Sequence, residues 1–321
     1  MGAFSQAMEA EPVAARASSP ALTGAATKHI VDLLIEERAP HLSQGPLWPL
    51  LRPPLYSVLN YAKAVRMADA IAPMGGREAL EFVSRLLSVQ VDVSGLERVP
   101  KTGAFLMLCN HPTGITDGVA VFDAIKTARP DVLFYANSDA HRVCPRFSET
   151  LIPVEWVAAK RTRERTRLTL KLTDEAFAAG RPIVVFPAGR LARRAGEKLI
   201  DPEWMPTAAS LARKCDLPIL PCHVAGPYAF WFHSFAKISG ELRDITLFHE
   251  LLNKRGKTYQ LRIGPPIWPG QIGADAAAAT RRVKYYVENN LGRDADAVFD
   301  PNGPECTWRD PNAPAAKLNP A

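Results

Sequence analysis

The sequence predicts an α/β fold, in which a largely parallel central sheet is flanked by helices and a small helical lobe precedes the sheet. Two observations lead to this prediction. From residue 89 onward, apolar runs of strand length alternate with longer segments of helical periodicity, as in parallel sheets with helical crossovers. Between residues 26 and 88 the apolar spacing is that of short helices.

Composition and periodicity divide the 321 residues into four regions. The chain is 47% hydrophobic and 22% charged, which is ordinary for a protein that buries a sizeable core. The expected regions are a mobile leader (1–25), a helical N-terminal lobe (26–88), an α/β domain (89–295) and a Pro-rich disordered tail (296–321).

The lobe is expected to hold short helices interrupted by proline and glycine. Ile30, Leu33 and Leu34 give residues 27–37 a helical spacing. Four prolines between residues 46 and 54 predict a loop. Helices are then predicted at 55–71 and 78–87, on either side of the segment Pro73-Met74-Gly75-Gly76.

The α/β domain begins with alternating valines at 89–93, which predict a half-buried strand. Asp275 is placed to cap the last predicted helix. The other predicted strands are 105–109, 132–135, 183–186, 219–224 and 259–263, and the predicted helices are 118–128, 162–179, 205–214 and 276–290.

Charge and cysteine usage narrow the functional classes. The net charge is +6, which suits contact with anionic lipid, phosphorylated substrates or nucleic acid. The five cysteines are scattered without metal or redox spacing, as expected of reduced thiols in a cytoplasm-like compartment. No run reaches the ~18 apolar residues of a membrane span, and the N-terminus lacks the pattern of a secretory signal. Membrane contact is therefore expected to be peripheral.

A histidine and an aspartate follow one predicted strand at its carboxyl end. His111 and Asp117 come after the apolar run 105–109, in a segment that contains Pro112 and Gly114. These residues predict a turn, which can fold the carboxylate onto one imidazole nitrogen and leave the other to accept a proton from a substrate hydroxyl. The alternative is that both side chains only stabilise the turn.

A glycine and an arginine follow another strand, predicted at 183–186. Gly189 can present its backbone N–H, and Arg190 its guanidinium, to an anion. A solvated basic loop explains the same pattern equally well. Together the two strand ends suggest an acid–base centre beside an anion site.

Residues 160–167 form a second basic segment, with five basic residues and one acidic residue. This segment opens the helix predicted at 162–179, where the helix dipole disfavours cations. A phosphate or an anionic lipid is therefore expected nearby, and a solvated helix face is the alternative.

Other chemistry finds less support. Aromatic side chains at 228–235 either line an acyl-chain groove, touch a bilayer surface or belong to the core, which is the commoner role. Asp139, His141 and His223, with His111, match no metal-site spacing. The Gly-x-Ser-x-Gly motif of serine hydrolases is absent.

The His/Asp motif resembles the first sequence block of the PlsC-type glycerolipid and lysophospholipid acyltransferases. Five residues separate His111 from Asp117, one more than is usual, and this spacing is similar to the bacterial hemolysin-like branch, which includes lyso-ornithine-lipid acyltransferases. Phe186-Pro187-Ala188-Gly189 resembles the Phe-Pro-Glu-Gly block, with Ala in place of Glu. Leu217-Pro218-Ile219-Leu220-Pro221 resembles the fourth block, and the similarity covers residues 89–270.

The resemblance implies an O-acyltransferase that moves a fatty acyl group from acyl-CoA or acyl-carrier protein to a lysolipid hydroxyl. His111 would be the general base, Asp117 its orienting carboxylate, and backbone N–H groups near Gly114 or Gly189 the oxyanion donors. The residues expected to bind substrate are Asn110, Thr113, Gly114, Lys160, Arg161, Arg163, Pro187, Gly189 and Arg190.

The partners implied are the lysolipid acceptor, the thioester donor and the inner face of the cytoplasmic membrane, on which the protein would lie peripherally, and not nucleic acid. No metal or redox cofactor is expected, because the hydroxyl attacks the thioester directly. Two alternatives remain open. The longer His–Asp spacing and Ala188 suggest a non-catalytic lipid- or acyl-CoA-binding protein on the same fold, and an N-acyltransferase would use the same base with an amino-acid amine.

Overall fold

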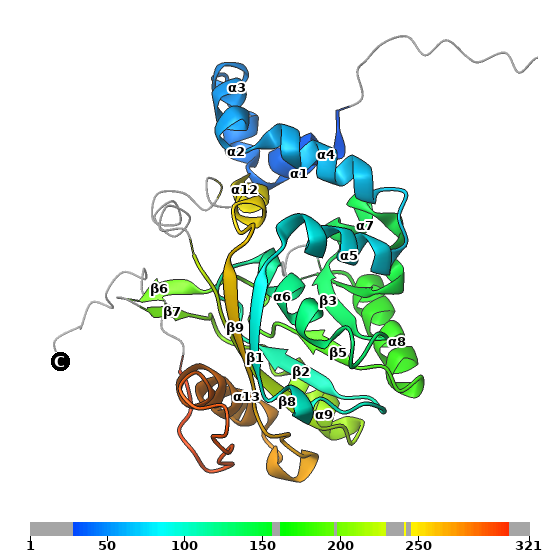
Figure 1. Cartoon of the computed structure of the whole chain (residues 1–321), viewed down its shortest axis with the longest axis vertical. Coiled ribbons are helices and arrows are strands. Elements are labelled where there is room, and N and C mark those ends of the chain that lie inside the picture. Colours follow the sequence, from blue (N-terminus) through cyan, green and yellow to red (C-terminus); the bar gives the residue numbers. More distant parts are fainter. Residues whose placement is uncertain (1–27, 156–160, 196–197, 229–240, 242–244, 308–321) are drawn as a thin grey trace, which may run out of the picture.

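A seven-stranded sheet forms the centre of the computed structural model, which describes residues 28–155, 161–195, 198–228, 241 and 245–307 (Figure 1). The strand order is β1-β9-β8-β2-β5-β3-β4, and all neighbours are parallel except β8 and β9. The predicted, largely parallel sheet is therefore confirmed. Its strands are β1 (Gln90–Ser94), β2 (Leu106–Cys109), β3 (Leu133–Asn137), β4 (Leu151–Val154), β5 (Ile183–Val185), β8 (Ile219–Ala225) and β9 (Thr258–Ile263).

Both faces of the sheet are covered by helices, which explains why the central strands are continuous apolar runs. Along β2, Met107 and Cys109 face one core, while Leu106 and Leu108 face the other. The first core includes α5 (Gly76–Leu87) and α6 (Ile115–Ile125), and the second includes α8 (Arg163–Ala178), α9 (Thr207–Lys214) and α13 (Ala276–Tyr285).

The last helix begins and ends as its sequence allows. The Asp275 carboxylate accepts hydrogen bonds from the N–H groups of Ala277 and Ala278, at 2.9 and 3.1 Å, so the predicted cap is confirmed. The helix then widens into a π-helical segment, Tyr286–Leu291. Short 3₁₀ segments occur at Leu96–Arg98, Pro145–Glu149 and Pro269–Gln271.

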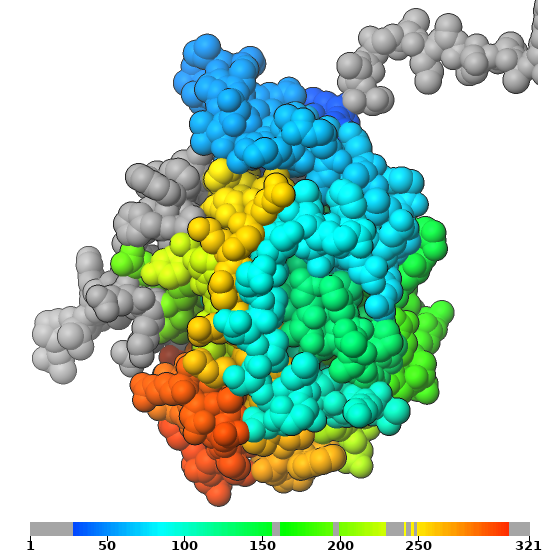
Figure 2. All heavy atoms as spheres, viewed as in Figure 1, coloured from blue at the N-terminus to red at the C-terminus, as the bar shows by residue number. Residues whose placement is uncertain are grey.

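Four N-terminal helices form a lobe at the top of the molecule (Figures 1 and 2). They pack around a core of their own, which includes Val31, Ile35, Tyr56 and Ala64. Helix α5 was expected in this lobe but packs on the sheet instead. The lobe consists of α1 (Ile30–Arg38), α2 (Pro40–Ser43), α3 (Trp48–Val58) and α4 (Tyr61–Ile71).

The loop predicted across residues 46–54 is wrong, because most of it is the start of α3. Pro49 lies in the first turn of α3, where a missing N–H costs nothing. Pro53 and Pro54 lie inside the helix and remove two backbone donors. The helix predicted at 55–71 is broken at Asn60, whose φ of 55° is left-handed, so α3 and α4 are separate.

The sequence analysis also missed three short strands and misjudged the tail. Pro153 lies in β4, at the edge of the sheet where proline is tolerated, and β6 (Arg193–Ala195) pairs with β7 (Lys198–Ile200) in a separate hairpin. The tail expected from residue 296 is ordered up to residue 307: Phe299 is buried against Tyr286. Residues 308–321 and the expected leader lie outside the described residues.

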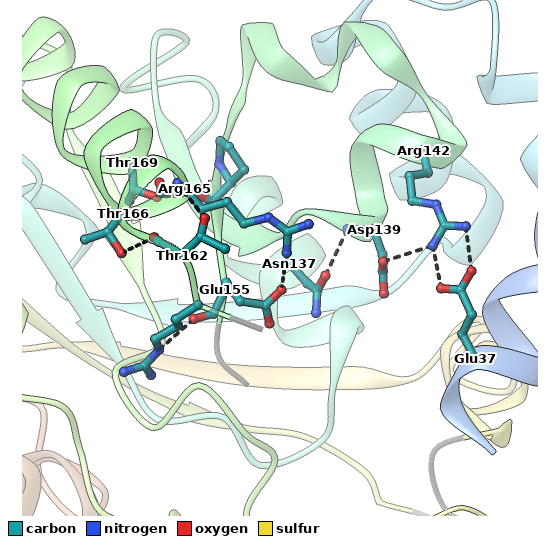
Figure 3. Close-up of polar contacts among 11 residues, drawn as sticks. Glu37, Asn137, Asp139, Arg142, Glu155, Thr162, Arg165, Thr166 and Thr169 are labelled. Carbon is teal, nitrogen blue, oxygen red and sulfur yellow. Dashed lines mark hydrogen bonds and ion pairs between the residues drawn. The ribbon is translucent and has the colours of Figure 1, made fainter. Parts of the chain in front are cut away.

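The lobe lies over the carboxyl edge of the five parallel strands. Helix α7 (Asp139–Val143) follows the carboxyl end of β3 and is tied to α1 by ion pairs. Arg142 donates to both carboxylate oxygens of Glu37, at 2.6 and 2.8 Å (Figure 3), and Arg38 pairs with Asp139 at 3.1 Å. Helix α12 (Leu247–Leu252) contacts α4.

Candidate active site

The two strand ends singled out in the sequence meet at the carboxyl edge of the sheet. His111 follows β2, Phe186 follows β5, and these strands are hydrogen-bonded neighbours. The His111 ring lies against the Phe186 ring, with centroids 4.5 Å apart. This edge is where ligands bind in open α/β sheets.

The Asp117 carboxylate folds back onto the imidazole of His111, as predicted. Nδ1 of His111 lies 2.9 Å from Oδ2 of Asp117. Asp117 is fully buried, and its Oδ2 also accepts from the N–H groups of Thr113 and Gly114, at 2.9 and 3.0 Å. Asp117 was expected in the turn itself. It lies instead in the first turn of α6, where the helix dipole favours a negative charge.

Thr113 and Gly114 build the turn that makes this contact possible. Gly114 adopts φ 110°, a backbone conformation that side-chain-bearing residues rarely adopt. The Thr113 hydroxyl donates to Oδ1 of Asp117 and lies 2.9 Å from the hydroxyl of Tyr259. Thr113 therefore holds the carboxylate and does not face substrate as expected.

Asn110 was also expected to bind substrate, but its amide holds the sheet together. Nδ2 donates to the carbonyl of Val224 at 2.9 Å, and Oδ1 accepts from the N–H of Val224 at 2.7 Å. The side chain thus extends the β2–β8 pairing beyond Cys109 and is buried in doing so.

Two residues near His111 were missed by the sequence analysis. Tyr259, on β9, supports Thr113 from 146 residues away, and burial together with the Asp117 charge raises its pKa. Asp201 accepts from the backbone N–H of His111 from 90 residues away. Burial and the nearby Glu288 raise the pKa of Asp201 to about 7. Neither residue carries a local signal, because its role depends only on tertiary contacts.

The backbone donors expected for an oxyanion are already engaged. The N–H of Gly114 donates to Asp117, and the N–H of Gly189 donates to the carbonyl of Phe186 at 3.0 Å. A donor near either glycine must therefore come from a neighbouring residue. Arg190, beside Gly189, is exposed.

A pocket of about 180 Å³ opens at the carboxyl ends of β4 and β5, between α8 and the start of α9, and neither His111 nor Asp117 lines it. Its wall includes Pro187, and its apolar lining comes from residues such as Val185, Leu170 and Met205. The polar part contains basic residues that precede or begin α8, together with Glu155 (Figure 3).

The basic segment contributes to this pocket only in part. Arg165 pairs with the Glu155 carboxylate at 3.0 Å, and Nε of Arg161 donates to the Glu155 carbonyl at 3.0 Å. Arg163 is exposed, and the pocket lining does not include it. Lys160 lies outside the described residues.

The remaining candidates are dispersed. Of the aromatic residues at 228–235, only Tyr228 belongs to the described part, and it is exposed. Nδ1 of His223 lies 3.0 Å from the Val287 carbonyl, and burial lowers the pKa of His223 to about 4. Asp139 and His141 lie on α7, at the end of β3.

Comparison with known proteins decides the family. The model of the acyltransferase family matches residues 59–292 of this chain. The chain belongs to the acyltransferase family. The family resemblance stated from the motifs is thus confirmed, and the matched range of this acyltransferase contains the whole His–Asp site.

Two curated relatives of this acyltransferase are named lyso-glycine lipid O-acyltransferases. The protein from Phocaeicola vulgatus is 30% identical over 202 residues, which cover 60% of this chain and 69% of the relative. The protein from Bacteroides thetaiotaomicron is 25% identical over 198 residues, covering 60% and 71%. Among solved structures, the 1-acyl-sn-glycerophosphate acyltransferase PlsC from Thermotoga maritima aligns with a TM-score of 0.44 and 16% identity, over 81% of this chain and 97% of that one.

The helices of this acyltransferase are short. Within the described residues, none has the length and apolar character that crossing a bilayer requires.

Proposed function

We propose that this acyltransferase moves a fatty acyl group from a thioester, carried by CoA or acyl-carrier protein, to the hydroxyl of a lysolipid. The observation that carries the proposal is the hydrogen bond between Nδ1 of His111 and Oδ2 of Asp117. This bond engages Nδ1 with the carboxylate and leaves Nε2 to accept a proton. The names of both relatives support a lysolipid hydroxyl as the acceptor.

In the proposed reaction the acceptor hydroxyl attacks the thioester carbonyl carbon while Nε2 of His111 takes its proton. The C–O bond forms, and the carbonyl oxygen becomes an oxyanion. When the oxyanion collapses, the C–S bond breaks, and the protonated imidazole gives its proton to the leaving sulfur. The products are an ester and a free thiol. A general base of this kind contributes about 10²–10⁴-fold to the rate.

For the oxyanion, we propose the N-terminus of α6 in place of the two glycines. The helix begins at Ile115, and the first N–H groups of a helix have no acceptor within it. The N–H groups of Ile115 and Thr116 are therefore the candidate donors. A donor of this kind is typically worth about 10²–10³-fold in kcat.

The pocket at the carboxyl ends of β4 and β5 is the proposed place for the acceptor, because its wall includes Pro187, which follows the Phe186 ring that lies against His111. Its apolar wall suits a hydrocarbon chain. Arg161, which lines the pocket, and the exposed Arg190, which follows Gly189 in the sequence, would hold an anionic head group. Arg165 shares its charge with Glu155, so it attracts a head group less strongly.

The non-catalytic alternative loses one of its two reasons. The longer spacing between His111 and Asp117 suggested a broken catalytic pair, but the two side chains lie within hydrogen-bonding distance at this spacing. Ala188 remains as the departure from the family block.

We further propose that the lobe rests on a membrane surface. Helix α3 and its N-cap Leu47 expose apolar side chains at intervals of three, four and seven residues, which is the spacing of one helix face: Leu47 (62% exposed), Leu50 (74%), Leu51 (42%) and Val58 (71%). Such a face is typical of a helix that lies in the membrane interface. The lobe is tied to α7 at the carboxyl edge of β3, which would bring the site close to the lipid.

Release of free thiol tests the catalytic proposal. Acyl-CoA and acyl-carrier protein are each supplied with lyso-glycine lipid, lyso-ornithine lipid and lysophosphatidic acid. We expect acceptor-dependent thiol release by the wild type and none by His111→Ala. The control is His41→Ala, because the His41 side chain is 94% exposed and lies in the lobe.

Unchanged turnover by His111→Ala, with the circular dichroism spectrum preserved, would refute the proposed base. Lipid binding without thiol release from any acceptor would favour the non-catalytic alternative. Release only with an amine acceptor would replace O-acylation by N-acylation.

Flotation with anionic vesicles tests the membrane proposal. Val58→Asp should reduce the bound fraction severalfold, because it places a charge on the apolar face of α3. Val298→Asp is the matched control, since Val298 is also 71% exposed but lies at the C-terminal side of the α/β domain. Equal losses in both variants would speak against α3 as the contact.

A further inference from the structure

The backbone of His111 is held from two sides by the ends of the β6–β7 hairpin. The N–H of Ala192, which immediately precedes β6, donates to the carbonyl of His111 at 3.0 Å. The carboxylate of Asp201, which immediately follows β7, accepts from the N–H of His111, with distances of 3.1 and 3.0 Å to its two oxygens. Because Arg193 is paired with Ile200 in the hairpin, these two contacts come from neighbouring positions, at the end of the hairpin where β6 begins and β7 ends.

Asp201 is an unusual residue for a purely structural hydrogen bond. Its side chain is 1% exposed, and burying a carboxylate without an ammonium or guanidinium in direct contact is costly. A second donor, Nε1 of Trp204, lies 2.9 Å from Oδ2. Both oxygens of the carboxylate are therefore used as acceptors.

Behind Asp201 lies a buried row of charged groups. The backbone N–H of Asp201 donates to Glu288 at 2.9 Å, and Glu288 accepts from Nζ of Lys284 at 2.6 Å. The thiol of Cys306 lies 3.3 Å from the same Nζ. The groups that face Asp201 from the packed elements include His111, Glu288, the buried Cys109 thiol of β2 and, one step further, Lys284 and Cys306.

We propose that Asp201 is a positioning residue for His111, which holds the main chain of the base while Asp117 holds its ring. The inference rests on the proposed function, because it requires His111 to be the base. A reacting group that shifts by about 1 Å can lose about 100-fold in rate. The turn at Gly114 is held by the Asp117 carboxylate, whereas the backbone N–H and carbonyl of His111 are held by Asp201 and Ala192, from elsewhere in the chain.

The charge of Asp201 makes this support dependent on pH. As an anion it accepts charge-assisted hydrogen bonds from His111 and Trp204, which weaken when it is protonated. The pKa of Asp201 is about 7, so the support weakens as the pH falls through neutrality. We therefore expect kcat to fall in a step near neutrality, down to the lower level of the enzyme in which Asp201 is protonated.

Asp201→Asn tests the inference. An amide offers one acceptor oxygen, and its NH₂ group would face the N–H of His111 or of Trp204. We expect kcat to fall about 10- to 100-fold at high pH with KM changed less than about twofold, and the step in log kcat near neutrality to disappear. Trp204→Phe, which keeps the carboxylate on His111, should retain this step.

The outcomes separate the inference from the proposed function. Full activity of His111→Ala refutes the proposed function. An inactive His111→Ala together with wild-type kcat and an unchanged step near neutrality in Asp201→Asn refutes the inference alone. A fall in kcat with the step retained assigns Asp201 a structural role and also overturns the inference.

A spectroscopic measurement decides the case in which Asp201→Asn does not fold. Tryptophan fluorescence of the wild type is titrated between pH 5 and 8 and compared with that of Trp204→Phe. A transition that requires Trp204 and coincides with the step in kcat near neutrality supports the inference. The absence of any Trp204-dependent transition in this range overturns it.

Discussion

At the scale of single residues, the carboxylate of Asp117 organises the site. It contacts the ring of His111 and accepts from the N–H groups of Thr113 and Gly114 and from the Thr113 hydroxyl. These donors hold the carboxylate in place, and the carboxylate in turn sets which imidazole nitrogen carries the proton. The His111–Asp117 pair is therefore held together by the N-terminal turn of α6 and the residues just before it.

Replacing Asp117 by Asn should lower kcat about 10²–10⁴-fold. The Asn NH₂ group would face N–H donors of the same turn, and the proton on Nδ1 of His111 would lose its charged acceptor. The measurement is thiol release with the best acceptor. Activity within twofold of wild type would argue that the pair is structural, as the alternative interpretation of the motif holds.

The contact between Tyr259 and Thr113 depends on a glycine, Gly226, beside the Tyr259 ring. A Cβ on Gly226 would lie 2.3 Å from Cε1 of Tyr259, so Gly226→Ala must displace the ring that supports Thr113. We expect a loss of about 1–3 kcal/mol in unfolding free energy and a reduced kcat. Gly270→Ala, with open space around its Cβ, is the control. Equal behaviour of both variants would show that Tyr259 has no role.

At the scale of secondary-structure elements, the connection from α12 to β9 contains a buried ion pair. Nζ of Lys254 lies 2.8 Å from Oε2 of Glu250, and their side chains are only 3% and 6% exposed. Removing Lys254 leaves Glu250 buried with the Asn253 amide as a donor but without its counter-charge, which costs far more than the pair contributes.

Lys254→Met should therefore lower the free energy of unfolding by about 3 kcal/mol in urea denaturation. The matched control is Lys171→Met on α8, whose partner Glu175 is also four residues away but whose side chain is 70% exposed. That change should cost less than about 0.5 kcal/mol. Adding Glu250→Gln to Lys254→Met should restore part of the loss, and a further loss would contradict the argument.

At the scale of the whole molecule, His223 makes the stability of the fold depend on pH. The pKa of His223 is about 4 in the folded protein because burial disfavours its charged form, whereas an unfolded chain has the ordinary value of about 6.5. Between these values the unfolded state binds the extra proton, so stability falls as the pH drops from about 6.5 to about 4.

His223→Asn should flatten this dependence, since its amide can still donate to the carbonyl of Val287. The difference in unfolding free energy between wild type and variant should change by up to about 3 kcal/mol across this range. Urea titrations at several pH values measure it. Taking the difference removes the opposite contribution of Asp201, whose raised pKa favours the folded state as the pH falls. A constant difference would contradict the assigned cause.

The sequence by itself determined the class of the fold and the first members of the site. Buried strands such as β2 and β5 are short apolar runs. Helices such as α8 and α13 are indicated by their periodicity, and Asp275 was predicted as the N-cap of α13, while Thr162 caps α8. The His–Asp contact was also predictable, because it is made within one turn. These features arise from interactions between residues close in the chain.

Only the tertiary structure decided which residues hold that contact in place. Tyr259 reaches Thr113 across 146 residues, and Asp201 reaches His111 across 90. The same holds for Asn110, which the motif suggested as a substrate contact but which bonds Val224 on the neighbouring strand. A hydrogen bond between distant residues leaves no spacing in the sequence, since the sheet order and the hairpin bring its partners together.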